Sequence, residues 1–262
     1  MSQHDEFDGI VVTHGSDTVS YTTAVLSYVF SGINKPIITV CSNYPLDDER
    51  TNGIDNFEVA LKIIREKKMK GVFSVNCVEN KKNIFLGTRM LEADYLLDTF
   101  RSSNGTPYAN VIGDRIIING ENINYHKSLI SDIEFNNKIL AYKNYVGMDY
   151  NAIDLNSVKP KAIMHFLYHS ATGCIVGGGE NLIRFIDRSK NLGIDNYFIS
   201  FKKDTRKLYV TTKAIIDAGC IALENISYMA CLTKMHVAYN QNDIPPIDYM
   251  TMPIAGEFIR NH

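Results

Sequence analysis

One short segment near the start of the chain combines side chains that are well suited to chemistry. In THGSDT, residues 13–18, Ser16 supplies a hydroxyl and Asp17 a carboxylate that can accept a proton or an ammonium group. Gly15 in front of them permits a ligand to approach the backbone closely. Serine and aspartate also favour the N-cap of a helix. The segment therefore fits either a binding turn or a helix cap.

Three further segments carry suggestive residues, each with a plainer alternative. His169, in YHSATG at residues 168–173, titrates near neutrality and fits an acid or a base, although a lone histidine at a strand end is more often structural. The glycines of GGGE, residues 177–180, precede a helix as in anion-binding loops, but the ending of a P-loop is missing, which favours a flexible connection. The acidic run at residues 47–49 offers oxygen ligands to a cation and is more typical of a solvated turn.

The elements around THGSDT predict an α/β fold with a mainly parallel sheet. Strand-length apolar runs alternate with amphipathic stretches, which is the pattern of such folds. The expected elements are strands at 9–14, 36–41 and 71–76, and helices at 21–30 and 54–66. THGSDT then lies at the carboxyl end of a strand, where open parallel sheets bind their ligands.

The alternation weakens after residue 76 and resumes in the second half of the chain. There we expect strands at 162–169 and 197–200, a helix at 180–190 and a long helical region at 221–239. Polar residues predominate from residue 121 to residue 138. We therefore expect a larger N-terminal α/β domain over residues 1–135 and a smaller C-terminal α/β domain over residues 136–262.

Composition excludes several classes of partner. The 262 residues include 27 basic and 29 acidic side chains, a balance that gives no electrostatic basis for binding nucleic acid. No apolar run approaches the length of a membrane span, and the acidic start does not resemble a signal peptide, so we expect a cytoplasmic protein. The five cysteines contain no CxxC pair and are interpreted as buried or inert thiols.

Residues 8–61 resemble the signature region of asparaginases, in which a strand ends in THGTDT, a helix follows and the next strand begins KPV. The segment GTRMLEADYLLDTFRSSN, residues 87–104, is similar to the family stretch with the motifs R-x-x-K and F-x-S-x-N. Residues 218–236, AGCIALENISYMACLTKMH, resemble the family helix that usually ends in LTKL. The resemblance covers residues 8–236 and implies the two-domain α/β fold described above.

The resemblance also implies an activity and an assembly. Asparaginases hydrolyse the side-chain amide of asparagine, and often of glutamine, through a threonine nucleophile and an acyl-enzyme ester. No metal or organic cofactor takes part, so the resemblance implies none here. Their active sites lie between subunits of an intimate dimer, which implies a homodimer or homotetramer.

Carried over by position, the family roles fall on residues of which several have changed type. Ser16 stands at the threonine of the second catalytic pair, and Asp17 at the aspartate that binds the substrate's amino group. Glu92 stands where R-x-x-K has its lysine, which reverses the charge and removes the cation that would activate a neighbouring hydroxyl. In YHSATG, similar to the family's YGSGN, His169 replaces the glycine and Thr172 the asparagine. Ser42 is a further candidate for substrate binding, and Thr13, Ser42 and Thr172 are alternative nucleophiles.

The resemblance begins after the family's glycine-rich first strand, GGTI, so we expect a shortened member without that strand, its nucleophilic threonine and the following flap. Two functions remain open. The first is an amidohydrolase that acts on a small amino-acid amide through Ser16, Asp17 and His169 in a rearranged site. The second is a non-catalytic ligand-binding or regulatory subunit that assembles with a partner chain. The missing nucleophile and Glu92 favour the second, with weak or absent asparaginase turnover.

Overall fold

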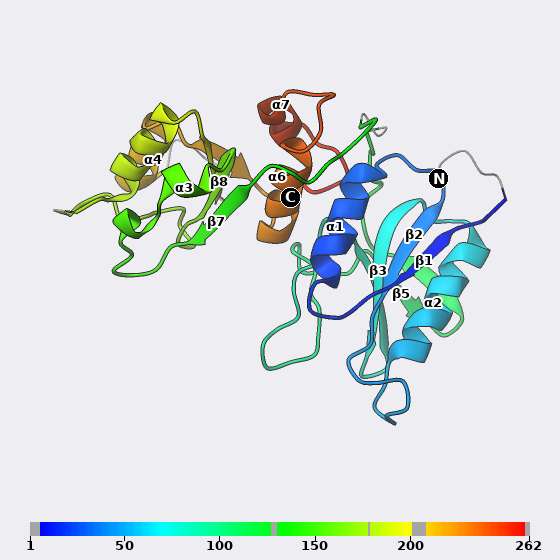
Figure 1. Ribbon diagram of the computed structural model, residues 1–262. Helices are drawn as coiled ribbons and strands as arrows, with labels where there is room; N and C mark the ends of the chain where they lie inside the picture. The colour runs from blue at the N-terminus through cyan, green and yellow to red at the C-terminus, as the bar shows by residue number, and fades with distance from the viewer. Residues whose placement is uncertain (1–5, 127–129, 178, 201–207, 260–262) are drawn as a thin grey trace. The chain divides into compact units, whose positions relative to one another are not determined.

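The computed structural model describes residues 6–126, 130–177, 179–200 and 208–259 (Figure 1). The chain divides into two units, which are treated separately. Unit 1 comprises residues 1–131 and 253–257, and unit 2 comprises residues 132–252 and 258–262. The division at residues 131 and 132 lies close to the expected boundary at residue 135. The return of residues 253–257 to unit 1 is a feature that no sequence pattern indicated.

Unit 1 is built on a six-stranded sheet with the order β1-β2-β3-β4-β5-β6. Its elements are β1 (Ile10–Thr13), α1 (Val19–Val29), β2 (Pro36–Val40), α2 (Gly53–Glu66), β3 (Gly71–Val78), β4 (Lys81–Leu86), β5 (Ala109–Ile112) and β6 (Arg115–Ile118). The first three strands pair in parallel, and β4 to β6 continue the sheet antiparallel. The expected α/β class is confirmed, but this sheet is mixed rather than mainly parallel.

A two-residue turn causes the change of direction. Glu79 and Asn80, between β3 and β4, both have positive φ, of 50° and 62°. Two consecutive left-handed residues are the signature of the tight turn that joins antiparallel strands. The chain therefore folds back on β3 instead of crossing over through a helix.

The two helices of unit 1 cover opposite faces of β1 to β3 (Figure 1). Thr23 of α1 bonds to Thr39 of β2 across a 2.7 Å hydroxyl–hydroxyl distance. On the other face, Ile38 and Val40 belong to one buried cluster with Val59 of α2. Because the strands follow in the order β1-β2-β3, helices on opposite faces require crossovers of opposite hand. One of the two is therefore left-handed, a rare arrangement.

Unit 2 is built on a four-stranded parallel sheet with the order β10-β9-β8-β7. Its elements are β7 (Ile139–Lys143), the 3-10 helix η1 (Tyr150–Ala152), α3 (Leu155–Val158), β8 (Ala162–Phe166), α4 (Leu182–Asn191), β9 (Asp195–Ser200), α5 (Val210–Asp217), β10 (Ile221–Glu224), α6 (Tyr228–Ala238) and α7 (Pro246–Thr251). The expected helical region at 221–239 begins instead as the strand β10. Asn225, with φ of 57°, ends that strand, and the Ser227 side chain caps α6.

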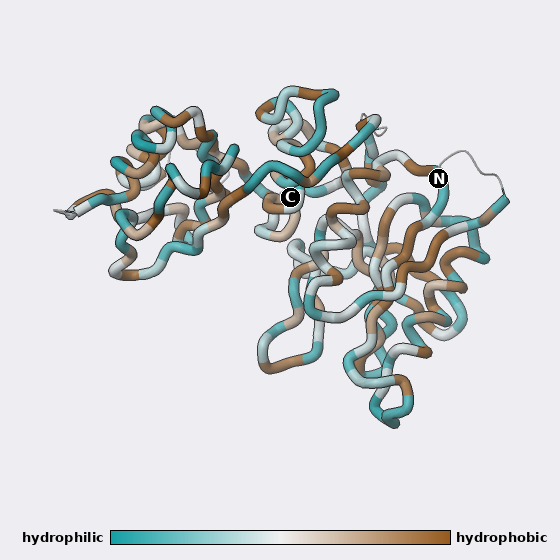
Figure 2. Tube along the Cα trace, in the orientation of Figure 1, coloured by the Kyte–Doolittle hydropathy of each residue, from teal (hydrophilic) through white to brown (hydrophobic). Residues whose placement is uncertain are grey.

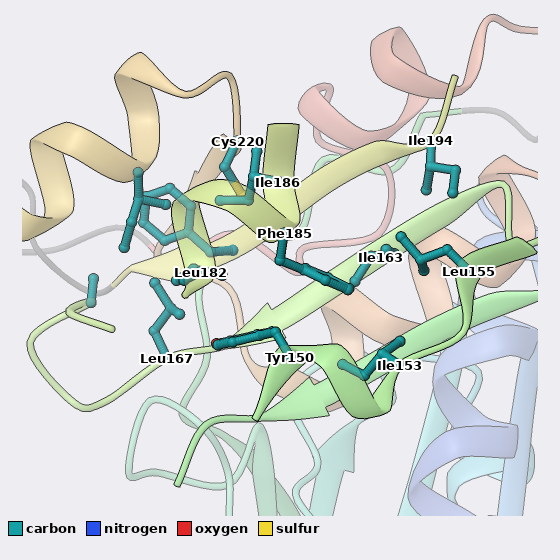
Figure 3. Packing of buried hydrophobic residues seen from close by; sticks show 13 residues of the cluster. Tyr150, Ile153, Leu155, Ile163, Leu167, Leu182, Phe185, Ile186, Ile194 and Cys220 are labelled. Carbon is teal, nitrogen blue, oxygen red and sulfur yellow. The ribbon is translucent and has the colours of Figure 1, made fainter. Parts of the chain in front are cut away.

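Burial of apolar side chains accounts for both units. In unit 1, hydrophobic residues run along β2 and β3 (Figure 2), and all five residues of β2 are buried. In unit 2, Leu155 of α3, Phe185 of α4 and Ile215 of α5 join one buried cluster (Figure 3). These three crossover helices share one face of the sheet, as right-handed connections require. Within the described ranges, every helix is too short or too polar to traverse a lipid bilayer.

Candidate functional site

A pocket of about 400 Å³ in unit 1 lies where several chain segments meet at the carboxyl ends of β1 and β2. Three segments form it: the turn after β1, the loop after β2 through Asn43, and the loop between β4 and β5. Its lining residues are Ser16, Asp17, Asn43, Glu92, Ala93, Asp94, Tyr95, Asp98 and Phe100. Three of the seven site residues expected from the sequence, Ser16, Asp17 and Glu92, are thus brought together.

The THGSDT turn leads from β1 into α1 and presents its side chains to this pocket. Ser16 is half-buried and Asp17 is exposed. The N-cap position of α1 is Thr18, whose side chain forms no capping hydrogen bond. Neither Ser16 nor Asp17 occupies the cap, so both side chains remain available to the pocket. The capping interpretation of Ser16 and Asp17 therefore does not apply, and the binding interpretation stays a prediction.

Glu92 faces the same pocket from the loop after β4. Its carboxylate accepts a short hydrogen bond from the hydroxyl of Tyr21 on α1. The lysine of the family motif is thus replaced by an acid that a tyrosine on the neighbouring helix holds in place. A carboxylate held there attracts a cation, whereas the family lysine would repel one.

The charges around the pocket are strongly unbalanced. Four carboxylates line it, on Asp17, Glu92, Asp94 and Asp98, and no basic side chain is among its described lining residues. Arg101 neutralises Asp94 through an ion pair of 2.6 Å. Asp98 is the acceptor for the Tyr44 hydroxyl at 3.5 Å. No residue in the described part of the chain forms an ion pair with Asp17 or Glu92. The pocket therefore favours a positively charged group.

Asparagine side chains on α2 and at its start fix the chain that follows β2. Asn56 is fully buried, donates to the Cys41 carbonyl at 2.7 Å and accepts from the Cys77 amide at 2.7 Å. Asn52 donates to the Cys77 carbonyl at 3.0 Å and accepts from the Asn43 amide at 2.9 Å. These bonds satisfy buried backbone groups at the ends of β2 and β3. They also place Asn43 in the pocket wall.

The remaining expected residues of unit 1 lie beside the pocket or open to solvent. A Cβ added at Gly15 would have no atom within 4 Å, so the backbone there is accessible. Ser42 does not line the pocket. Its hydroxyl donates to the Tyr44 carbonyl at 2.7 Å and lies 2.9 Å from the Thr51 hydroxyl, which holds the loop after β2 together.

His169 and Thr172 lie in unit 2, in the loop after β8. His169 is exposed, with its Nδ1 atom 3.4 Å from the Ser170 hydroxyl. The Thr172 carbonyl accepts from the Tyr168 amide at 3.1 Å and closes the loop. The roles expected for His169 and Thr172 stay predictions.

The other suggestive segments have local structural explanations. Asp48, in the acidic run at 47–49, pairs with Arg50 at 2.7 Å, and this hydrogen-bonded guanidinium lowers the Asp48 pKa. After the glycines at 177–180, Asn181 caps α4 by accepting from the Ile183 and Arg184 amides. Among the described residues, no group of three histidine, cysteine or acidic side chains could hold a metal ion.

Buried thiols add no nucleophile to the pocket. Four of the five cysteines are buried, and Cys174 is exposed. Burial raises the pKa of Cys41 to about 11 and that of Cys77 to about 12. A thiol with so high a pKa is protonated near neutrality and unreactive. The interpretation of these buried cysteines as small hydrophobic residues agrees with this environment.

Sequence reasoning missed six residues of the pocket wall: Asn43, Ala93, Asp94, Tyr95, Asp98 and Phe100. A signal for Asn43 was present, because it follows the second strand as Ser16 follows the first, and such strand ends meet at one sheet edge. Tyr95 and Asp98 lie in an irregular loop without periodicity. Their position depends on contacts such as the 2.8 Å bond from the Asn43 side chain to the Asp98 carbonyl.

Comparisons with known proteins place these features in one family. The family model "Asparaginase, N-terminal" matches residues 1–124. The L-asparaginase of Thermococcus kodakarensis is 27% identical over 259 residues, which cover 97% of this chain and 76% of that protein. A glutamyl-tRNA(Gln) amidotransferase subunit from Sulfolobus acidocaldarius is 26% identical over 267 residues, 95% of this chain and 58% of that protein. The chain thus spans little more than half the length of this relative.

A solved structure gives the same result for the fold. The thermostable L-asparaginase from Thermococcus kodakarensis superposes with a TM-score of 0.78, covering 98% of this chain and 78% of that one at 23% identity. The asparaginase-like fold expected from the motifs is confirmed. The motifs at residues 8–104, the match of residues 1–124 to the family model and the similarity along nearly the whole chain together show that the chain is asparaginase-like.

Proposed function

We propose that unit 1 binds a small amino-acid-type ligand through its ammonium group, and that the chain is an asparaginase-like protein with incomplete catalytic machinery. The observation that carries the proposal is the Asp17 carboxylate, exposed in a pocket of about 400 Å³ and unpaired by any described residue. An ammonium group would bring Asp17 its missing countercharge. Ser16 and Asn43 beside it offer a hydroxyl and an amide to the rest of the ligand.

The incomplete machinery is proposed from the groups that surround Ser16. Acyl transfer needs an activated hydroxyl and donors that stabilise the oxyanion. Ser16 faces a wall of carboxylates, which would raise the energy of a developing negative charge. Glu92, in place of the family lysine, supplies no cation. These features support binding over turnover for the chain taken alone.

A titration of the purified protein with L-asparagine tests the binding site. We expect heat release with a stoichiometry of one per chain, and Asp17→Asn should weaken binding by about tenfold to a hundredfold, since a charge-assisted hydrogen bond is lost. Asp48→Asn is the matched control, because Asp48 pairs with Arg50 outside the pocket lining. Equal affinities for Asp17→Asn and the unmodified protein would remove Asp17 from the site.

An assay for ammonia released from asparagine and glutamine, against heat-denatured protein as background, tests turnover. We expect release well below the rate typical of enzymes, which is on the order of ten per second. Turnover at that ordinary rate would refute the proposal of incomplete machinery while leaving the binding site intact. Thr13, Ser42 and Thr172 would then be replaced one at a time to find the nucleophile.

A second candidate function is assembly with identical chains or with a partner chain. It is favoured by the similarity to proteins named as amidotransferase subunits. We propose a homodimer or homotetramer as the first form to test. Light scattering that gave the 29.5 kDa monomer at every concentration would contradict self-assembly and would direct the search to a different partner chain.

A further inference from the structure

The turn that carries Ser16 and Asp17 needs a support other than a helix cap. At most strand-to-helix turns, a capping side chain fixes the first residues of the helix. Here Thr18 occupies the N-cap position without a side-chain hydrogen bond. Ser16 and Asp17 face the pocket instead. An exposed turn without a cap would sample several conformations, and its pocket residues would lose their fixed positions.

His14 supplies such a support from both sides of its ring. Its Nδ1 atom lies 2.8 Å from the Gly15 carbonyl, and its Nε2 atom lies 2.9 Å from the Thr22 hydroxyl on α1. The His14 main-chain amide also donates to the Val40 carbonyl at 2.9 Å, which extends the pairing of β1 with β2 by one residue. The side chain therefore joins the strand end, the turn and the first turn of the helix.

The chemistry of the two contacts fixes the tautomer of the neutral ring. A carbonyl oxygen is an acceptor only, so Nδ1 must carry the hydrogen that is donated to Gly15. In the neutral ring Nε2 is then an acceptor, and the Thr22 hydroxyl donates to it. Both nitrogens are engaged within the protein. His14 is therefore poorly placed to exchange a proton with a ligand and well placed to hold the turn.

We infer that His14 is a positioning residue, which orients the Ser16–Asp17 turn toward the pocket by clamping the Gly15 carbonyl to α1 through Thr22. The inference deepens the proposed ligand site and rests on it for its function. The clamp itself is a property of the free protein. It can therefore be tested without any ligand, and its failure is distinguishable from failure of the proposed function.

Four variants distinguish the effect of the His14 bond to Gly15 from that of its bond to Thr22. His14→Ala removes both of them. His14→Asn places an amide donor near the Nδ1 position and keeps the bond to Gly15, whereas His14→Gln places its amide near Nε2 and keeps only the contact with Thr22. Thr22→Val removes the helix end of the clamp at nearly constant volume. We expect the Ser16–Asp17 turn to be disturbed most in His14→Ala, less in His14→Gln and less again in Thr22→Val. His14→Asn should be closest to the unmodified protein.

The first measurement is backbone ¹⁵N relaxation of residues 15–18 in the ligand-free protein. Order parameters near about 0.85 are expected for the unmodified protein and His14→Asn, and below about 0.6 for His14→Ala. Long-range ¹⁵N–¹H spectra in mildly alkaline buffer should show the His14 hydrogen on Nδ1. A hydrogen on Nε2, or a turn that stays equally rigid in His14→Ala, would overturn the inference whatever the protein binds.

The second measurement is L-asparagine affinity in a double-mutant cycle with Asp17→Ala. His14→Ala should weaken binding about tenfold or more in the unmodified background and have almost no effect once Asp17 is gone, because coupled residues are not additive. A purely structural histidine would lower affinity equally in both backgrounds, and this result would refute the positioning role. If L-asparagine does not bind the unmodified protein, the proposed ligand fails, and the relaxation data decide on the clamp alone.

Discussion

Gly15 is a glycine at a position where the backbone does not demand one. Its φ is not among the positive values, and an added Cβ would enter open space. Gly15→Ala should therefore leave the free energy of unfolding unchanged or raise it by up to about 1 kcal/mol, because it restricts the unfolded chain. If the ligand lies against this backbone, the same methyl group weakens L-asparagine binding severalfold.

Thermal unfolding and calorimetric titration of Gly15→Ala measure the two effects separately. Gly179→Ala is the matched control, since a Cβ there also meets no atom within 4 Å and Gly179 lies in unit 2. The control should change neither ligand affinity nor stability by much. Unchanged affinity in Gly15→Ala would show that the ligand does not approach this part of the turn.

Glu92 sets the charge preference of the pocket in our proposal. L-aspartate, L-asparagine and L-asparaginamide share one carbon skeleton and differ mainly in net charge, from negative through neutral to positive. We expect affinity to rise in that order, because the pocket is lined by carboxylates without a basic residue among those described. Glu92→Gln should reduce the differences in affinity among the three ligands by about two- to fivefold, which is the scale of an exposed charge pair.

Tyr21→Phe is the companion variant for this series, because it keeps the carboxylate and removes its hydrogen-bond donor. It should preserve the charge order while lowering all three affinities by a similar factor. An affinity series that is identical in Glu92→Gln and in the unmodified protein would mean that Glu92 does not face the bound ligand.

At the scale of elements, β8 contains a titratable group that links stability to pH. His165 is fully buried, its Nε2 atom lies 3.0 Å from the Asn196 side-chain oxygen, and burial lowers its pKa to about 4. The unfolded chain takes up a proton on this ring below about pH 6.5, while the folded chain does so only near pH 4. The neutral ring therefore stabilises the fold fully above about pH 6.5, and this contribution disappears as pH falls toward 4.

The pKa shift corresponds to a loss of about 3 kcal/mol between neutral pH and pH 4. His165→Gln keeps an amide donor for Asn196 and does not titrate. Urea unfolding followed by circular dichroism should show that the unmodified protein loses more stability than His165→Gln over this range. Parallel pH curves for the two proteins would mean that His165 is not held neutral in the folded state.

Helices and strands differ in how well the sequence predicts them. The helix expected at 21–30 is α1 at Val19–Val29, and the strand expected at 36–41 is β2 at Pro36–Val40. A short continuous apolar run, buried throughout, indicates the strand. The residues of β10 are predicted as helix, since IALE contains helix-favouring residues and its extended form depends on pairing with β9. Strand β4 begins with the polar residues KKN and is defined by its pairing with β3.

At the scale of the whole molecule, the sequence predicts the parts of the site that belong to local motifs. Ser16 and Asp17 follow a recognisable strand and precede a recognisable helix, so their place at the pocket could be predicted. Asp98 could not, because the irregular loop between β4 and β5 brings it to the pocket through tertiary contacts. The return of residues 253–257 to unit 1 is likewise a tertiary feature without a local pattern.

Residues 253–257 complete the buried interior of unit 1. Ile254 and Ala255 are buried, and the Ile254 carbonyl accepts from Ser31 at 2.8 Å. The Ala255 carbonyl accepts from the Thr88 hydroxyl at 2.9 Å, and the Gly256 carbonyl accepts from Arg89 at 2.8 Å. Arg89 is itself buried, so losing this acceptor leaves part of a guanidinium unsatisfied.

A chain that ends at Met252 should therefore have a less stable unit 1. Lost burial of Ile254 and the unsatisfied groups together should cost about 3 kcal/mol or more, which corresponds to hydrogen exchange at least about a hundredfold faster in β3 and β4 if they exchange by global opening of the unit. A chain ending at Glu257 is the control. Both truncations remove Phe258, whose ring lies 4.6 Å from the Lys234 ammonium in unit 2, so their difference isolates residues 253–257. Equal protection of β3 and β4 in the two truncated chains would show that this segment only covers unit 1 and does not hold it together.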